Sequence, residues 1–257
     1  MNKLKVLSIA GSDPSSGAGI QVDLKTVQAL GAFGMALPAA LTVQNSRGVS
    51  GVQAVSAPFF FKQLQTLLSD IRPDAVKTGM LLTKQNVEAT AVLLGKFKIS
   101  NLVVDPVFKS TSGKMLLQPA AVKALTGKLF PLATLVTPNI PEAEHLSGMT
   151  IRSEREMDYA AGKILDLGPS YVLVKGGHRK GPAADTLYGG ETVVAFSTAR
   201  RKGEFHGTGC VLSSAIAVFI ARGLPVEKAV EKAKQLVDRM LTTAKPVGTG
   251  RAKYFQF

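Results

Sequence analysis

Short apolar runs alternate with helical segments along most of this chain, and this alternation constrains the fold more than any other feature. The runs are rich in Val, Ile and Leu, which is typical of strands buried on both faces of a parallel sheet. The intervening segments have the apolar spacing of helices, and Ser153-x-x-Glu156 has the form of a capping box. The expected strands are 4–10, 75–78, 102–105, 133–137 and 171–175, and the expected helices are 20–30, 59–71, 85–97, 119–129 and 153–167.

Strands and helices in alternation predict right-handed βαβ crossovers and a three-layer α/β/α sandwich with a mostly parallel central sheet. Ligands of such folds bind at the carboxyl ends of the strands. Near the C-terminus, Gly189-Gly190 is typical of a hairpin turn between strands 186–188 and 191–196, and two helices are expected over 209–221 and 225–243. Because no linker or internal repeat interrupts the pattern, we expect residues 1–257 to form a single domain.

Composition predicts a soluble, cytoplasmic protein. No apolar stretch approaches the roughly 20 residues of a membrane helix, and the run 6–10 is too short for a signal peptide. The single cysteine, Cys210, excludes an intramolecular disulfide and fits a reducing compartment. A formal net charge of +13 suits anionic partners such as nucleotides. Nucleic-acid binding is the weaker explanation, because the basic residues are dispersed and only residues 200–202 form a compact run.

Several common enzyme signatures are missing from the sequence. It has no Walker A motif, no Gly-x-Gly-x-x-Gly after a strand, no His-Glu-x-x-His and no Gly-x-Ser-x-Gly. These absences argue against the common nucleotide-binding fingerprints and against zinc-hydrolase and α/β-hydrolase sites. The three histidines, His145, His178 and His206, have no metal-binding spacing, although His206 directly precedes a glycine-rich turn.

That turn, Gly207-Thr208-Gly209-Cys210, lies at the start of the penultimate helix. Free N–H groups and the positive end of the helix dipole converge at such a start, where they can bind an anion and stabilise a phosphoryl group in transfer. Cys210 is expected to have a lowered thiol pKa there and to accept a proton from an attacking alcohol. By itself the turn is more simply a helix start with a small buried cysteine.

Charged side chains follow or adjoin several expected strands. Asp105 and Glu142 at strand ends could hold magnesium against nucleotide phosphates, and Lys175 places a cation near the same edge. Asp23, one turn into the first helix, could bind an amine or hydroxyl of a substrate beside the Gly- and Ser-rich loop 11–19. Each of these residues, considered singly, is more simply a surface charge or a first-turn acid.

Six segments in chain order carry a more specific signal. They are 11–26 (GSDPSSGAGIQVDLKT), 41–46 (LTVQNS), 77–80 (KTGM), 105–107 (DPV), 137–143 (TPNIPEA) and 206–210 (HGTGC). Any one of them is weak evidence. Together, spread over nearly the whole chain, they resemble the hydroxymethylpyrimidine and phosphomethylpyrimidine kinase family of the ribokinase-like superfamily.

The resemblance implies a ribokinase-like kinase, usually a homodimer, that uses ATP and Mg²⁺. The implied substrates are the thiamin-pathway alcohol 4-amino-5-hydroxymethyl-2-methylpyrimidine and then its monophosphate. In the implied mechanism the hydroxymethyl oxygen attacks the γ-phosphoryl group in line. Neither nucleic acid nor membrane is an expected partner.

The resemblance also implies roles for individual residues. Cys210 faces the reactive hydroxyl, and the turn of Gly207, Thr208 and Gly209 binds the transferred phosphoryl group. The residues implied to hold or enclose the pyrimidine are Gly11, Asp23, Gln44, Met80 and Val107. The residues implied to lie near the nucleotide are Asp105, Glu142, Lys175 and Asp185, of which Asp105 and Glu142 organise Mg²⁺.

The chain departs from the family pattern at two places. Ser16 stands where relatives commonly have glycine, and Thr111 stands where a lysine is expected in the loop after Asp105. Lys109 is a possible replacement for that charge. The second departure bears on the handling of phosphate charge and on the second transfer more than on the fold.

Two other functions are consistent with parts of the sequence. A pyridoxal kinase would phosphorylate a similar hydroxymethyl group on a heteroaromatic ring, although Gln44 and Met80 favour the pyrimidine. A non-catalytic protein that binds nucleic acid or a phosphometabolite would use the positive charge without turnover.

Overall fold

The computed structural model describes residues 3–109, 113, 115–176, 183–190 and 192–257. Its strands are β1 (Lys5–Ser12), β2 (Phe33–Asn45), β3 (Gly48–Ala54), β4 (Ala75–Thr78), β5 (Leu102–Val104), β6 (Leu135–Val136), β7 (Tyr171–Lys175), β8 (Ala183–Gly189), β9 (Thr192–Thr198), β10 (Lys245–Pro246) and β11 (Lys253–Tyr254). Its α-helices are α1 (Gly19–Ala29), α2 (Ala57–Asp70), α3 (Lys84–Lys96), α4 (Pro119–Ala124), α5 (Ile140–Ser147), α6 (Glu154–Leu165), α7 (Thr208–Ala221) and α8 (Val226–Thr243).

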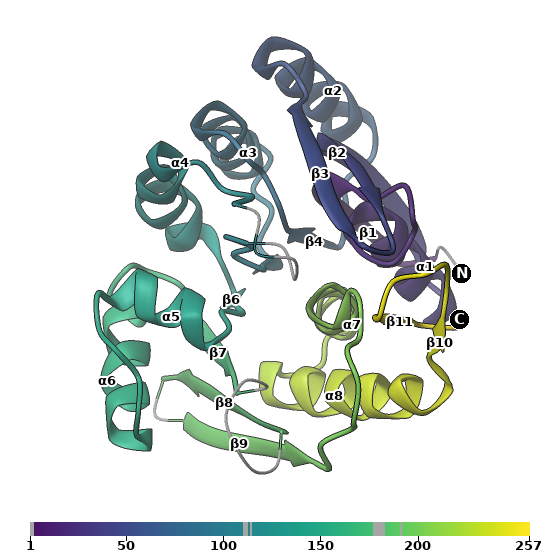
Figure 1. Ribbon diagram of the computed structural model, residues 1–257. Helices are drawn as coiled ribbons and strands as arrows, with labels where there is room; N and C mark the ends of the chain where they lie inside the picture. The colour runs from purple at the N-terminus through teal and green to yellow at the C-terminus, as the bar shows by residue number, and fades with distance from the viewer. Residues whose placement is uncertain (1–2, 110–112, 114, 177–182, 191) are drawn as a thin grey trace.

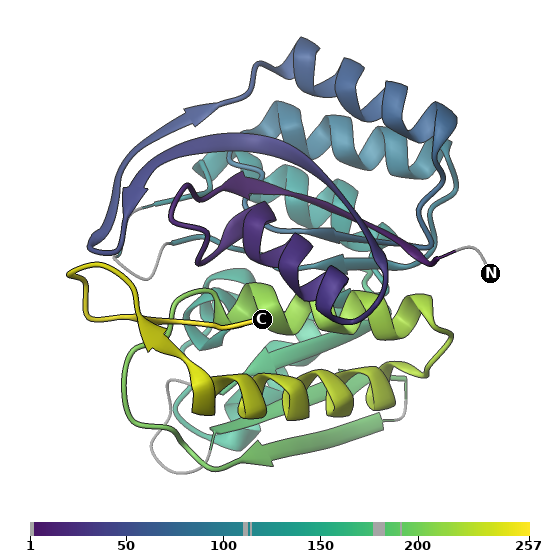
Figure 2. The ribbon, with the colours of Figure 1, turned by 90° about the vertical axis from the view of Figure 1, so that its right-hand side faces the viewer.

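A nine-stranded sheet runs through the molecule in the order β3-β2-β1-β4-β5-β6-β7-β8-β9 (Figures 1 and 2). The strands from β2 through β1 to β7 pair in parallel, and the edge pairs β2–β3, β7–β8 and β8–β9 are antiparallel. Helices cover both faces (Figure 1). The expected three-layer sandwich with a mostly parallel sheet is therefore confirmed.

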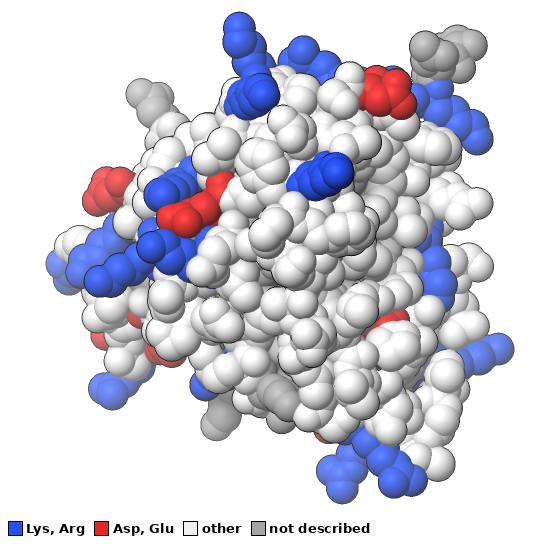
Figure 3. Space-filling model, turned by 90° about the horizontal axis from the view of Figure 1, so that it is seen from above, with Lys and Arg blue, Asp and Glu red and all other residues white. Residues whose placement is uncertain are grey.

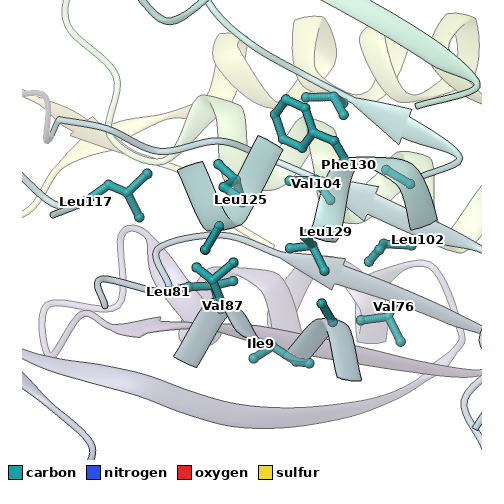
Figure 4. Close-up of a cluster of buried hydrophobic side chains, with 14 of the residues drawn as sticks. Ile9, Val76, Leu81, Val87, Leu102, Val104, Leu117, Leu125, Leu129 and Phe130 are labelled. Atoms are coloured by element: carbon teal, nitrogen blue, oxygen red, sulfur yellow. The ribbon is translucent and has the colours of Figure 1, made fainter. Parts of the chain in front are cut away.

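Each face of the sheet has its own apolar core, because neighbouring residues of a strand point to opposite faces. Leu7 and Ile9 of β1 belong to the core that includes residues of α2, α3, α5 and α6, whereas Val6 belongs to the core that includes residues of α1, α7 and α8. Figure 4 shows the first core, where Ile9 and Val76 of the sheet lie near Val87 of α3 and near apolar side chains of the helical segment 119–132. The strands are buried on both sides, which explains their nearly continuous apolar sequence.

Several element boundaries differ from the sequence-based expectation. The helix expected over 119–129 ends as an α-helix at Ala124 and continues as a π-helical turn, Leu125–Leu129, and a 3₁₀ turn, Phe130–Leu132. Gly127 weakens the regular helix, and Pro131 lacks the N–H that would continue it. The helix expected over 153–167 is confirmed with its capping box, in which Ser153 Oγ accepts from the Glu156 N–H at 3.2 Å.

The antiparallel ribbon of β2 and β3 was not among the expected elements. Burial alternates along much of β2, and Leu41 and Val43 are 51% and 67% exposed. Gly34 and Pro38 interrupt the run 33–41 with residues that are uncommon inside strands, so the sequence signal for a strand there is weak. Helix α5 was also not foreseen, although Asn139 and Glu142 form a capping box at its start.

None of the helices in the described part of the chain is long and apolar enough to span a membrane. Figure 3 shows lysine and arginine side chains at separate places on the face seen from above, with wide uncharged areas between them. The positive charge is dispersed on this face, as the sequence indicated.

Candidate functional site

A cavity of about 1380 Å³ opens at the carboxyl edge of the sheet. The strands β1, β4 and β7, the start of α7, part of α8 and the C-terminal segment contribute to its wall. Of the residues expected in the site, those that line the cavity are Gly11, Gln44, Met80, Asp105, Val107, Glu142, Lys175, Asp185, Gly207, Thr208, Gly209 and Cys210. The fold therefore gathers residues from widely separated segments at the edge where a ligand was expected.

The turn before α7 is held by backbone packing that requires glycine. Gly207 has φ +79°, and a Cβ atom there would lie 1.9 Å from the carbonyl oxygen of Gly17. A Cβ atom at Gly209 would meet only the polar ends of side chains, 3.3 Å from Lys175 Nζ and 3.5 Å from Asp105 Oδ2. Gly207 has no side chain to cap the first turn of α7. The start of this 14-residue helix is therefore suited to bind an anion from the cavity.

Cys210 lies in the first turn of α7 and faces the same cavity. The expectation of a lowered thiol pKa is wrong: removal from water raises the pKa of Cys210 to about 11, and the positive charge of Lys77 offsets only part of that effect. Burial outweighs the favourable position at the helix start. The side chain is therefore a neutral thiol at neutral pH, not a resident thiolate.

Asp23 does not line the cavity, which corrects its assignment as a substrate ligand. Its side chain is 0% exposed, and its carboxylate accepts hydrogen bonds from Ser8 Oγ at 2.6 Å and Ser214 Oγ at 2.8 Å. Lys77 Nζ lies 3.0 Å from Oδ1 and 2.8 Å from Oδ2. With these partners, the carboxylate is committed to the protein interior.

Lys77 lines the cavity and was not singled out from the sequence. Burial acts to lower its pKa, but the charges of Asp23 and Asp105 oppose this effect and the pKa is raised above its ordinary value. The sequence contained a signal for this role, because a lysine inside the buried strand β4 requires a charged partner and so indicates a buried ion pair. Lys77 therefore supplies a permanent positive charge at the floor of the cavity.

Asp105 and Lys175 form an ion pair of 2.7 Å at the ends of β5 and β7. Thr137 Oγ1 donates to Asp105 Oδ1 at 3.1 Å. Burial opposes ionisation of Asp105, but Lys175 and Lys77 hold its pKa below the ordinary value. The carboxylate is therefore charged at neutral pH.

Glu142 lies near this pair, at the start of α5. Burial raises its pKa to about 7, the charge of Lys175 opposes the shift and that of Asp105 reinforces it. Its Oε2 accepts from the Asn139 N–H at 2.8 Å, which orients the side chain. Two carboxylates that disfavour each other's ionisation suit a divalent cation, and Mg²⁺ is commonly held by one or two carboxylates together with substrate phosphates. The residues present therefore fit magnesium.

No group of three or more His, Cys, Asp or Glu side chains able to hold a metal ion exists among residues whose positions are described. An ion held by Asp105 and Glu142 would therefore depend on the phosphates and on water for its other ligands.

Asp185 joins the loop after β7 to helix α8. Its Oδ1 accepts from the Gly176 N–H at 3.0 Å, and its Oδ2 pairs with Lys234. Asp185 and Lys234 both line the cavity, along with Val237 of α8. This part of the wall combines a neutralised ion pair with apolar side chains.

Gly11 and Met80 are in direct contact on the opposite side of the cavity. A Cβ atom at Gly11 would lie 2.2 Å from Met80 Cε, so the absence of a side chain at Gly11 lets the end of Met80 rest directly on β1. Met80 packs in a small apolar cluster with Ala40 and Leu116, against which Val107 rests. The result is an apolar wall suited to a flat ring, with Gln44 as a polar group nearby.

The loop after Val107 was expected to handle phosphate charge. Lys109 lines the cavity and is exposed. Thr111, the departure from the family pattern, lies outside the described residues, as does His178. Ser16 adopts φ +59°, a conformation for which glycine is the usual residue, so this departure carries a local backbone cost.

Comparison with known proteins gives a consistent result. Residues 13–254 match the family model described as phosphomethylpyrimidine kinase. A hydroxymethylpyrimidine/phosphomethylpyrimidine kinase of Rhizobium meliloti (strain 1021) is 44% identical over 256 residues, which cover 98% of this chain and 96% of the relative. A thiamine biosynthesis bifunctional protein of Geobacter sulfurreducens is 45% identical over 247 residues, which cover 95% of this chain and only 50% of that protein.

Solved structures show the same relationship. A phosphomethylpyrimidine kinase from Clostridium difficile 630 has a TM-score of 0.83 and 41% identity, with 92% of this chain and 99% of that chain covered. The pyridoxal kinase from Staphylococcus aureus, in complex with AMP-PCP, has a TM-score of 0.90 and 34% identity, with coverage of 99% and 93%.

Proposed function

The chain belongs to the phosphomethylpyrimidine kinase family, and from that premise we propose that it uses ATP to phosphorylate 4-amino-5-hydroxymethyl-2-methylpyrimidine and then the resulting monophosphate. One observation carries the proposal. A single cavity joins an apolar wall with Gln44 to the glycine turn before α7 and to the Asp105–Lys175 pair. A ring, a phosphoryl group and a nucleotide could thus meet in one cavity.

The chemical requirements of phosphoryl transfer match this arrangement. The transition state is loose in most analyses, so catalysis depends mainly on positioning and on stabilising charge on the phosphoryl oxygens. The amides at the start of α7 would contact these oxygens, and the ammonium of Lys175 lies 3.3 Å from the position that a Cβ atom on Gly209 would take. Asp105 and Glu142 would hold Mg²⁺, which neutralises phosphate charge when it is bound.

We assign Cys210 a contact with the hydroxyl that attacks the phosphoryl group. Its neutral thiol positions that hydroxyl at rest, and the small fraction present as thiolate accepts the hydroxyl proton as the new bond forms. In the second transfer the nucleophile is an anionic phosphate, which needs no base. The first transfer therefore depends on Cys210 more than the second does.

A coupled ATPase assay with three acceptors tests the proposal. Turnover with the pyrimidine alcohol and with its monophosphate, dependent on Mg²⁺, is the expected result. Pyridoxal kinase is the alternative favoured by the TM-score of 0.90, and a kcat/KM for pyridoxal above that for the pyrimidine alcohol would establish it instead. If none of the three acceptors supports ATP consumption, both functions are contradicted.

We also propose that the protein is a homodimer. Leu41 and Val43 are exposed on the β2–β3 ribbon, and a second copy could cover them. Light scattering coupled to size-exclusion chromatography would report a monomer if this proposal is wrong.

A further inference from the structure

His206 makes two polar contacts through the same ring nitrogen. Its Nε2 atom lies 2.9 Å from Asp13 Oδ2 and 3.0 Å from the amide nitrogen of Gln44. All three residues line the cavity. A single nitrogen can either donate or accept, so the chemical state of Asp13 decides what Gln44 must do.

Asp13 is an acceptor in this arrangement. Oδ1 accepts from the N–H and hydroxyl of Ser15 at 2.9 and 2.7 Å, and Oδ2 accepts from the N–H groups of Gly17 and Ala18 at 3.2 and 2.9 Å. Burial opposes its ionisation, but hydrogen bonds from His206 and Ser15 hold the pKa of Asp13 below the ordinary value. Because the ionised carboxylate has no proton to give, His206 must carry the hydrogen on Nε2.

The same N–H group faces the side chain of Gln44, which must therefore present an acceptor. An amide nitrogen at this place would put two donors against each other. Thr42 gives an independent reason for the same conclusion, because its hydroxyl donates to the Ser12 carbonyl at 2.9 Å and has no second proton for the Gln44 atom 3.1 Å away. A rotation of the Gln44 amide by 180° satisfies both neighbours, with its oxygen toward His206 and its nitrogen toward Thr42.

We propose that His206 and Asp13 are positioning residues that fix the Gln44 carbonyl toward His206, so that Gln44 presents an N–H donor to the ligand. One amide hydrogen then bonds Thr42, and the other is free for an acceptor atom of the ring in the cavity. The favoured ligand is a heteroaromatic ring with an unprotonated nitrogen beside the Gln44 amide. The identity of that ring as the pyrimidine rests on the proposed function, whereas the amide orientation does not.

The structure fixes the imidazole from its other sides. A Cβ atom at Gly17 would lie 2.2 Å from His206 Cδ2, so the ring packs directly on the loop that Asp13 organises. The ring of Tyr254 meets His206 edge to face with centroids 5.2 Å apart, and the Tyr254 hydroxyl lies 3.2 Å from Ser15 Oγ. The C-terminal strand and the first loop thus hold the imidazole in one orientation.

A measurement on the full-length protein without substrates tests the orientation directly. A two-bond ¹H–¹⁵N correlation spectrum identifies which nitrogen of His206 carries hydrogen. We expect hydrogen on Nε2, and a neutral ring with hydrogen only on Nδ1 would overturn the proposal. This readout needs no turnover, so it remains valid if the proposed function fails.

Binding of the pyrimidine alcohol, measured by calorimetry without ATP, tests the consequence. Gln44→Glu keeps an acceptor for His206 but removes the N–H donor, so its Kd should rise at least about tenfold, as in Gln44→Ala. Wild-type affinity in Gln44→Glu would overturn the proposal. If the wild-type protein does not bind the pyrimidine, the proposed function fails, and the spectrum alone decides the orientation.

A double-variant cycle separates positioning from general structural support. His206→Phe keeps a ring against Tyr254 and should raise the KM for the pyrimidine alcohol about tenfold, with kcat and the KM for ATP nearly unchanged. In the Gln44→Ala background the same change should have no further effect on that KM. Equal effects in both backgrounds, or a matching rise in the KM for ATP, would show that His206 acts on the turn and not through Gln44.

Discussion

The ammonium group of Lys77 lies 2.8 and 3.0 Å from the two carboxylate oxygens of Asp23, and the two side chains are only 1% and 0% exposed. Strand β4 and helix α1 are thereby linked beneath the floor of the cavity. Hydroxyls of Ser8 and Ser214 complete the carboxylate's hydrogen bonds. A buried ion pair of this kind is costly to break from one side, because the remaining charge stays buried without a partner.

The Asp23–Lys77 pair should therefore matter for stability as a unit. We expect Asp23→Asn and Lys77→Met each to lower the free energy of unfolding by about 3–5 kcal/mol. The double variant should lose clearly less than the sum of the two, because it leaves no unpaired charge. Urea titrations measure all three values. Lys228→Ala, which breaks an exposed pair with Glu231, serves as the control and should leave the free energy of unfolding nearly unchanged. Additive losses in the double variant would contradict the coupling.

The two glycines at the start of α7, Gly207 and Gly209, should respond differently to alanine. Gly207→Ala places a Cβ atom 1.9 Å from the Gly17 carbonyl oxygen at a positive φ, so the variant should lose stability and bind ligands poorly. Gly209→Ala meets only side-chain atoms at 3.3 Å or more, so it should fold normally. Its methyl group would nevertheless enter the space above Lys175 and lower kcat at least about tenfold. Thermal unfolding and steady-state kinetics separate the two effects. Equal melting temperatures of the two variants would contradict the packing argument.

Glu142 should make stability depend on pH in the metal-free protein. Its pKa is about 7 in the folded state against an ordinary 4.5, so between these values the folded protein holds a proton that the unfolded chain has released. The unfolding free energy therefore falls as pH rises through this window, by up to roughly 3 kcal/mol. The contribution is fully present below pH 4.5 and lost above pH 7.

Glu142→Gln provides the matched comparison, because its amide oxygen can still accept from Asn139. Urea titrations in the presence of EDTA at pH 5 and pH 8 should show wild-type stability falling relative to this variant. A constant difference between the two proteins would contradict the raised pKa.

The central parallel strands β1 and β4 to β7 were predictable because each is a short apolar run at the centre of the sheet. The expected 75–78 and 171–175 coincide with β4 and β7. The β2–β3 ribbon was not predictable in the same way, because half of its residues face away from the core and its apolar side chains include exposed ones such as Val43. Periodicity reports burial, so it identifies the centre of the sheet better than the edge.

The sequence predicted that the site residues lie at the carboxyl edge of the sheet, but it did not predict which of their side chains enter the cavity. Asp105, Lys175 and Gln44 line the cavity, as their places in the sequence motifs predicted. The same reasoning placed Asp23 in the cavity, whereas three neighbours bind its carboxylate in the interior. Whether a side chain points into a cavity or beneath it depends on partners from distant segments, and a linear pattern does not contain that information.

Cys210 shows the same limit in its electrostatics, and it allows a direct measurement because the chain has one cysteine. Removal from water raises the pKa of its thiol to about 11, so the thiolate fraction at neutral pH should be very small. The rate of alkylation by iodoacetamide should then increase about tenfold per pH unit between pH 7 and pH 10 and remain well below that of a free thiol, with N-acetylcysteine as the control. A rate that levels off below pH 8 would instead establish a resident thiolate.

In single-turnover experiments at neutral pH, Cys210→Ala should slow transfer to the alcohol much more than transfer to the monophosphate, because only the alcohol must lose a proton as it attacks. Equal losses for the two acceptors would leave Cys210 with a packing role.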